Sequence, residues 1–258
     1  MKRKHFMMAG VMLAMATGMT SCVISGRGLS MTEEPQMGEN RQLKDFEEIE
    51  ISGSPTVYYT QADSFSVRVE GPESYVSDIL TEVKGRTLTI RNRGKVGFIN
   101  ISRDYDNAAV YVSSPDLTSI LLSGSGDFIS QQRVDTDNMR IVLRGPGDIE
   151  FKNIISDRCE TELTGSGDIS VGRLETLQSV VSLIGSGDIK LVQWDVADTD
   201  VSLRGSGDIA VSFEGRCQRA QCQLTGSGDI KLSGRLGHYS GQKRGSGDID
   251  TDKLSVEK

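Results

Sequence analysis

Histidine is almost absent from this chain of 258 residues, which contains only His5 and His238. An imidazole-based zinc site needs several histidines, and a catalytic triad needs one beside a nucleophile and a carboxylate. His238 is a lone histidine in a glycine-rich stretch, a setting typical of the surface. The chain also has no Walker-type phosphate loop, and its Gly-rich motifs lack the strand-to-helix context of a dinucleotide site. We therefore predict no catalytic residue and no cofactor.

Positive charge is also in short supply, with 29 Lys and Arg against 36 Asp and Glu and a formal net charge of −7. Removal of a leader with Lys2, Arg3 and Lys4 leaves 26 cations against the same 36 acids, a net charge near −10. Nucleic-acid binding requires a basic surface that neutralises phosphates. Nucleic acid is therefore not an expected partner.

Cysteines are few, and three of the four follow residue 150. In a stack of coils Cys159 would lie too far from Cys217 and Cys222 for a disulfide, so only the latter two could pair. A small buried side chain is the favoured role for Cys159 and Cys222.

A repeated tetrapeptide dominates the C-terminal half. Gly-Ser-Gly-Asp followed by Ile or Phe occurs six times, and a seventh copy has Pro in place of Ser. First glycines are separated by 19 to 21 residues, and such a fixed period is typical of a solenoid. The copies begin at Gly124, Gly145, Gly165, Gly185, Gly205, Gly226 and Gly245.

Apolar and polar residues alternate on both sides of each motif, as in strands with one buried face. Paired glycines allow a sharp bend between the two strands. A meander of hairpins would not need to keep the 20-residue register, so we predict an all-β fold, a parallel β-solenoid with about 20 residues per coil. One inward column is Leu143, Leu163, Leu183, Leu203 and Leu224, and another is Ile149, Ile169, Ile189, Ile209 and Ile230.

The first 116 residues are organised differently. Residues 1–21 have a basic start and a short apolar run, the pattern of an export signal, and Met19 to Cys22 resembles a lipobox, which predicts lipidation at Cys22. Residues 22–44 are predicted to be a flexible tether.

The folded domain is predicted at 45–258, with irregular coils and a cap at 45–116 and regular repeats at 117–258. Residues 49–59 read as a degenerate coil, and residues 72–80 are predicted to form a short helix. Solenoids need atypical ends, and charged residues near the C-terminus protect the last edge.

The aspartates of the repeats are the one feature with a chemical alternative. As turn residues they can accept backbone N–H bonds, which is the favoured interpretation. Calcium binding is a rival hypothesis, and a glycosidase pair is a weaker one because catalysis needs two carboxylates in unlike surroundings. The residues are Asp127, Asp148, Asp168, Asp188, Asp208, Asp229 and Asp248.

The segments FEEIEISGSPTV and LTSILLSGSGDF, the GSGDI series and the lipobox together resemble the putative auto-transporter adhesin family with a head GIN domain, found in Bacteroidetes lipoproteins. The resemblance covers nearly everything from Asp45 onward. It implies a right-handed β-helix similar to pectin-lyase-like folds, without catalytic residues, that acts in cell adhesion.

The leading hypothesis is a non-enzymatic lipoprotein of the cell envelope, anchored to the outer membrane through Cys22 and exposed on the periplasmic face or the cell surface. Its expected partner is a host or cell-surface glycan or protein. The alternatives are a pectin-lyase-like enzyme acting on glycans and a calcium-binding repeat protein, with no metal ligand assigned.

Overall fold

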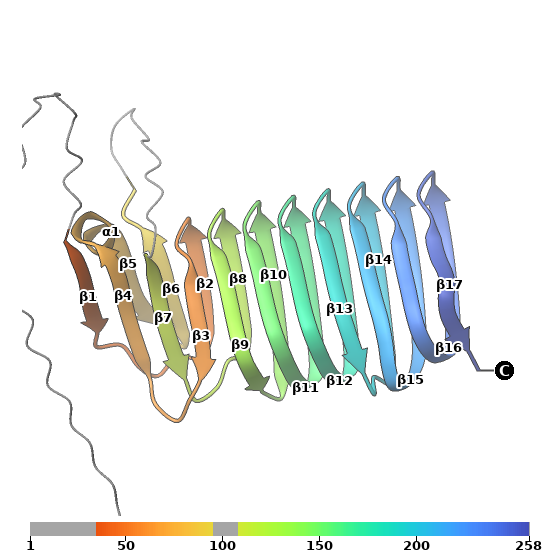
Figure 1. Cartoon of the computed structure of the whole chain (residues 1–258), viewed down its shortest axis with the longest axis horizontal. Coiled ribbons are helices and arrows are strands. Elements are labelled where there is room, and N and C mark those ends of the chain that lie inside the picture. Colours follow the sequence, from red (N-terminus) through yellow and green to blue (C-terminus); the bar gives the residue numbers. More distant parts are fainter. Residues whose placement is uncertain (1–34, 95–107, 258) are drawn as a thin grey trace, which may run out of the picture. The chain divides into compact units, whose positions relative to one another are not determined.

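The structure is a computed structural model that describes residues 35–94 and 108–257. The export signal, Cys22 and the first part of the tether lie outside these residues. Figure 1 shows the rest of the chain as coils stacked side by side, almost entirely of strands, with the single described helix, α1, near one end. The predicted β-solenoid is confirmed, with about seven turns of roughly 20 residues each.

The regular coils are built from parallel strands in constant register. Leu143 pairs with Leu163, Leu163 with Leu183, and the same column continues through Leu203 to Leu224. The strands are β8 Ser119–Gly124, β9 Asp127–Asp135, β10 Asn138–Gly145, β11 Asp148–Gly165, β12 Asp168–Gly185, β13 Asp188–Trp194, β14 Asp198–Gly205, β15 Asp208–Gly226, β16 Ile230–Gly245 and β17 Ile249–Val256.

The core lies between the strands of each coil. The five leucines and the five isoleucines of the predicted columns are each at most 2% exposed, which confirms both columns. Burial of such a side chain contributes about 1.5–3 kcal/mol. Stacking of identical residues thus contributes substantially to the hydrophobic stabilisation of the repeats.

Each coil contains a third short segment that the sequence analysis did not predict. In β11 the inward positions step by two, except that Ile154 follows Phe151 and Cys159 follows Ser156 at intervals of three. Two consecutive residues face outward at each of these places, so the chain bends there as well as at the glycine corner. The column through Ile154 continues with Leu174, Gln193 and Phe213.

Gln193 interrupts that column with a fully buried amide. Its Nε2 donates to Ser179 Oγ at 2.8 Å, and its Oε1 accepts from Thr199 Oγ1 at 2.7 Å. All three side chains are buried, and their mutual bonds offset the cost of removing polar groups from water.

The N-terminal coils mix parallel and antiparallel strands. Gly53 pairs in register with Gly124, so the degenerate coil predicted at 49–59 is confirmed. β2 also pairs with β6, β3 with β7, and β4 runs antiparallel between β1 and β7. The elements are β1 Gln36–Arg41, β2 Glu48–Gly53, β3 Val57–Gln61, β4 Ser66–Pro72, α1 Glu73–Asp78, β5 Ile79–Lys84, β6 Thr87–Asn92 and β7 Ala109–Ser114.

Two details of this region differ from expectation. β1, Gln36–Arg41, lies within the predicted tether. It pairs with β4 over its whole length, so the folded part begins before Asp45. The short helix is present, but Pro72 stands at its N-cap with φ −57° instead of at the first helical position. Tyr75 and Val76 of α1 are buried and help to close this end of the stack.

The C-terminal end is closed by substitutions within the repeat. Tyr239 packs against the core, and Gly241 and Lys243 occupy the register positions of Cys222 and Leu224 in the coil before. A Cβ at Gly241 would lie 2.1 Å from the Tyr239 hydroxyl oxygen, so only glycine leaves room for this ring. Across the described residues, no helix has the length and apolar character needed to cross a membrane.

Candidate functional site

The glycine corners bring the backbones of successive coils into direct contact. Gly185 has φ +139°, and a Cβ there would lie 2.1 Å from the carbonyl oxygen of Gly165. At the second glycine, Gly187, a Cβ would lie 1.9 Å from the carbonyl oxygen of Gly167. The first glycine is therefore required by both conformation and space, and the second by space alone.

The predicted aspartates form a ladder that joins one coil to the next. In five consecutive pairs the Oδ1 atom accepts the backbone N–H of the aspartate in the following coil, at 2.9–3.2 Å. These carboxylates therefore accept backbone N–H groups, but each donor belongs to the next coil and not to the local turn that the sequence suggested. The pairs run Asp148 to Asp168, Asp168 to Asp188, Asp188 to Asp208, Asp208 to Asp229 and Asp229 to Asp248.

The ladder ends differently from its middle. Asp248 lies in the last described coil, and its carboxylate forms an ion pair with Lys243. Asp127 in the first motif lies 3.5 Å from the Thr56 hydroxyl, which donates to its Oδ2 atom. Lys243 thus stands in register with the core residue Leu224 and supplies a charged partner for Asp248.

Electrostatic surroundings vary along the ladder. Burial raises the pKa of Asp127, and this outweighs the lowering by the hydrogen bond from the backbone N–H of Asp148. A hydrogen bond from Lys231 at 2.8 Å lowers the pKa of Asp208. The other carboxylates of the middle of the ladder, Asp148, Asp168, Asp188 and Asp229, accept the same kind of backbone N–H, so they form no pair in unlike surroundings of the kind that acid–base catalysis needs.

No cluster of three or more His, Cys, Asp or Glu side chains suited to a metal occurs in the part of the chain that the structure describes. His238 lies exposed on β16, as predicted for a surface histidine.

The three described cysteines are free and buried. Burial raises the pKa of the Cys159 and Cys222 thiols to about 12, so both remain protonated at neutral pH. Cys159 and Cys222 take the small buried role that the sequence predicted. Cys217, whose pairing with Cys222 was left open, is also unpaired in this structure.

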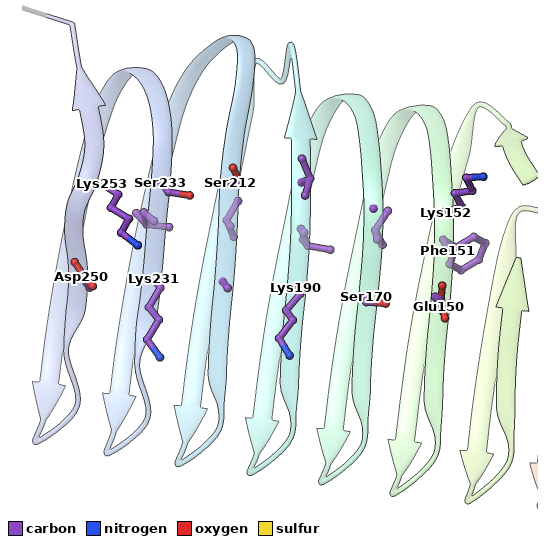
Figure 2. A pocket seen from close by; sticks show the side chains of 17 residues that line it. Glu150, Phe151, Lys152, Ser170, Lys190, Ser212, Lys231, Ser233, Asp250 and Lys253 are labelled. Carbon is purple, nitrogen blue, oxygen red and sulfur yellow. The ribbon is translucent and has the colours of Figure 1, made fainter. Parts of the chain in front are cut away.

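A groove of about 510 Å³ crosses the outer face of the strands that follow the aspartates. Figure 2 shows the side chains that line it, which come from β11, β12, β13, β15, β16 and β17 of successive coils. One outward row of the groove consists of the residues two positions after the aspartate in each of these coils, namely Glu150, Ser170, Lys190, Ala210, Lys231 and Asp250. Small side chains in this row and beside it, including Gly172 and Ser212, keep the groove open.

Lysines come into this groove from four coils of an acidic chain. Lys231 forms an ion pair with Asp208 at 2.8 Å, and Lys190 lies 3.9 Å from Asp188. Lys152 and Lys253, near the two ends of the groove, form no ion pair with any described residue. Two of the four ammonium groups are therefore free to meet a ligand.

The same outward row continues beyond the groove onto a tyrosine pair. Glu150 is in register with Ile129, Ile129 with Tyr58, and Tyr58 with Tyr111. The two rings stack with centroids 5.5 Å apart and an interplanar angle of 17°, and the residues are 39% and 43% exposed. Because each ring covers one face of the other, the pair presents a ridge of ring edges.

Sequence reasoning missed both the groove and the ridge. The repeat itself contained one usable signal for the groove, since the position two residues after the aspartate holds a small or a charged residue in the six coils from Glu150 to Asp250, whereas the first motif has Ile129 there. No comparable signal existed for the tyrosines, because Tyr58 and Tyr111 are brought together by irregular coils.

The family model described as "Putative auto-transporter adhesin, head GIN domain" matches residues 45–216, and no curated protein sequence matches the chain. The crystal structure of a putative adhesin from Bacteroides fragilis is 24% identical, with a TM-score of 0.73 over 84% of this chain and 97% of that one. A putative lipid binding protein from Parabacteroides distasonis is 25% identical, with a TM-score of 0.62 over 86% of this chain and 97% of that one. A putative adhesin from Parabacteroides merdae is 19% identical, with a TM-score of 0.64 over 86% and 96%.

Proposed function

We propose that this chain, which belongs to the putative auto-transporter adhesin family with a head GIN domain, is a non-enzymatic module that binds a ligand on the surface of a cell. The observation that carries the proposal is the continuous outer face formed by the groove and the tyrosine ridge. Exposed tyrosines and unpaired cations gathered on one rigid face are typical of a binding surface. The absence of a unique carboxylate pair in the described ladder favours binding over glycan cleavage.

The location proposed for this module is the cell envelope, with the protein anchored by a lipid on Cys22. The support is the sequence of residues 1–22, with its basic start, apolar run and lipobox-like end. Replacement of Cys22 by Ser is expected to release the protein from membranes or to block its processing. Unchanged membrane retention of C22S in a fractionation experiment would contradict the anchor.

Binding is tested by measuring how the full chain, labelled with a fluorophore, associates with washed epithelial cells and washed bacterial cells. Saturable binding is expected, and it should be lost in Ala210→Tyr, which fills the centre of the groove. Ser202→Tyr is the matched control, because Ser202 faces outward from β14 on the opposite sheet of the same stretch of coils. Binding that is absent, or that is equal in the two variants, would overturn the proposal.

Lipid binding is a second candidate, favoured by the groove lining. Val192, Ala210 and the aliphatic parts of the lysines give the groove apolar surface beneath charged ammonium groups. One structural neighbour is described as a putative lipid binding protein. Co-sedimentation with phosphatidylglycerol vesicles, compared with phosphatidylcholine vesicles, tests this function. Binding to the anionic vesicles by C22S that is lost in C22S/A210Y would favour it over adhesion.

A further inference from the structure

We infer that the groove binds an extended, linear polysaccharide laid across the coils, with successive sugar units on successive coils. This inference rests on the proposed binding function and names the ligand class for the same face. The outward row of the groove passes through six coils, from Glu150 on β11 to Asp250 on β17. Figure 2 shows Lys190 and Lys231 extending from this face on coils two apart.

The first argument is the repeat distance. Parallel coils are spaced by about 4.8 Å, so the six coils of the groove span about 24 Å. A sugar ring in an extended, equatorially linked chain advances by nearly the same distance as one coil. A ligand with this repeat meets an equivalent outward position at every unit, whereas an extended peptide advances by about 3.3 Å per residue and loses register.

The second argument is the chemistry of the row. Hydroxyl groups both donate and accept hydrogen bonds. The row supplies donors from Lys190 and Lys231, acceptors from Glu150 and Asp250, and a hydroxyl from Ser170. A purely anionic ligand would be repelled by the carboxylates at both ends of the row, and a purely cationic one by the lysines in the middle. A chain of hydroxyl groups can donate hydrogen bonds to the carboxylates and accept them from the lysines.

The third argument is the steric profile. Ala210 lies between Lys190 and Lys231 in register, and its small side chain leaves space between two long ones. Gly172 and Ser212 in the neighbouring row also keep the surface low. The groove is lined by polar groups at its edges, and its outward row continues through Ile129 to the tyrosine ridge, where edges of Tyr58 and Tyr111 can pack against further sugar units.

The test is isothermal titration calorimetry of the full chain with soluble oligosaccharides of defined linkage and length. The probes are the β-1,4-linked glucose hexamer, its dimer, the α-1,4-linked glucose hexamer, which coils, and the β-1,4-linked mannose hexamer, which is straight and uncharged. Binding is expected for at least one of the straight hexamers and not for the dimer or the coiled hexamer. Failure of both straight hexamers, or equal binding of the coiled one, would overturn the inference.

Variants then place the binding in the groove. Lys152→Gln and Lys253→Gln remove free ammonium groups without breaking an ion pair, and each lost charged hydrogen bond is expected to weaken binding roughly tenfold. Ala210→Tyr should abolish binding. Arg204→Gln and Ser202→Tyr on the opposite sheet are the controls and should bind as the original chain does. Hexamer binding that survives Ala210→Tyr would contradict the assignment.

The same variants separate this inference from the proposed function. If cells bind in a groove-dependent manner and protease treatment of the cells removes the binding while no straight hexamer binds, the adhesion function stands and the glycan assignment fails. If neither cells nor hexamers bind, both fail. If both bind and both are lost in Ala210→Tyr, both are supported.

Discussion

The N-terminal coils and the repeat coils both bury a hydrophobic core, but different interactions stabilise the two regions. The N-terminal region uses antiparallel strands, a helix and aromatic contacts, such as the tilted pair Phe46 and Phe65 with centroids 5.1 Å apart. The repeats use no helix and rely on backbone contact at the corners and on columns of one residue type. The mixed elements of the N-terminal region cover the end of the stack, whereas identical coils allow the stack to be extended. Four predictions test this difference, from the largest expected effect to the smallest.

The glycine corners should show the largest difference between the regions. Gly187→Ala places a Cβ 1.9 Å from a backbone oxygen of the adjacent coil, so it should lower the free energy of unfolding by more than about 4 kcal/mol or prevent folding. Gly85, in the turn between β5 and β6, has φ +64° and no atom within 4 Å of an added Cβ. Gly85→Ala should cost about 1–2 kcal/mol from backbone strain alone.

Urea denaturation of both variants measures these costs. Equal costs for Gly187→Ala and Gly85→Ala would show that the corner backbones do not approach as closely as the structure has them.

The leucine column should be the next most sensitive feature. Leu183 is 0% exposed between identical neighbours, and Leu183→Ala should cost about 2–5 kcal/mol through lost burial and a cavity. Leu80 on β5 is only partly buried, and Leu80→Ala should cost less, about 1 kcal/mol. A loss below about half a kcal/mol for Leu183→Ala in a thermal or urea melt would place that column outside the core.

The aspartate ladder separates hydrogen bonding from charge. In the N-terminal region a neutral residue makes the equivalent hydrogen bond, since Asn92 Oδ1 accepts the backbone N–H of Ser54 at 3.0 Å. Asp188→Asn should therefore change the melting temperature little, while Asp188→Ala, which leaves the Asp208 N–H without its acceptor, should cost about 1–2 kcal/mol.

Calcium binding by the ladder is the competing hypothesis, and it predicts a different result in the melting experiment. The melting temperature of the original chain should be the same in chelator and in millimolar calcium. A rise of many degrees with calcium that is smaller in Asp188→Asn would mean that the ladder binds metal.

The smallest expected effect is an opposite pH dependence at two positions of the ladder. Asp208 has a pKa lowered by Lys231, so its charge stabilises the fold above the ordinary value of 3.8 and this contribution disappears as the pH falls through the lower folded value. Asp127 has a pKa raised by burial, so its charge begins to cost stability as the pH rises above 3.8 and costs it in full above the folded value.

Melting curves at pH 3 to 7 compare Asp208→Asn with Asp127→Asn. At neutral pH the first variant should be slightly less stable than the original chain and the second slightly more stable, and these differences should shrink in acid. The same sign for both variants would contradict the opposite shifts. High salt should reduce the Asp208 effect, because its ion pair with Lys231 is largely exposed.

Much of the fold could be predicted because the repeat fixes which residues stack. Once the first glycines are aligned, Leu183 and Ile189 fall into columns without any knowledge of the structure. The third segment of each coil escaped prediction because its inward residues differ in kind, from Ile154 and Leu174 to the amide of Gln193. β1 escaped because QMGENR has no apolar alternation and owes its strand conformation to pairing with β4.

The candidate site was less predictable for a geometric reason. Periodicity in the sequence identifies the inward residues, because packing keeps their type the same from coil to coil. A ligand contacts the outward residues, whose type is not fixed by packing. The donor to each aspartate also lies 19 to 21 residues away, so the inter-coil bond could not be distinguished from a local turn. Tyr58 and Tyr111 are 53 positions apart and meet only because β3 and β7 pair in parallel.

The identical register of successive coils also makes the coil a unit of genetic change. Deletion of residues 149–168 would join Asp148 directly to Ile169, leave the tetrapeptide motif unbroken, and bring Leu143 against Leu183 and Gly145 against Gly185. Unequal recombination between neighbouring repeats in the gene would produce such in-frame products. Each event would shorten or lengthen the outer face by one coil without disturbing the core, so descendants of one gene could carry faces of graded length.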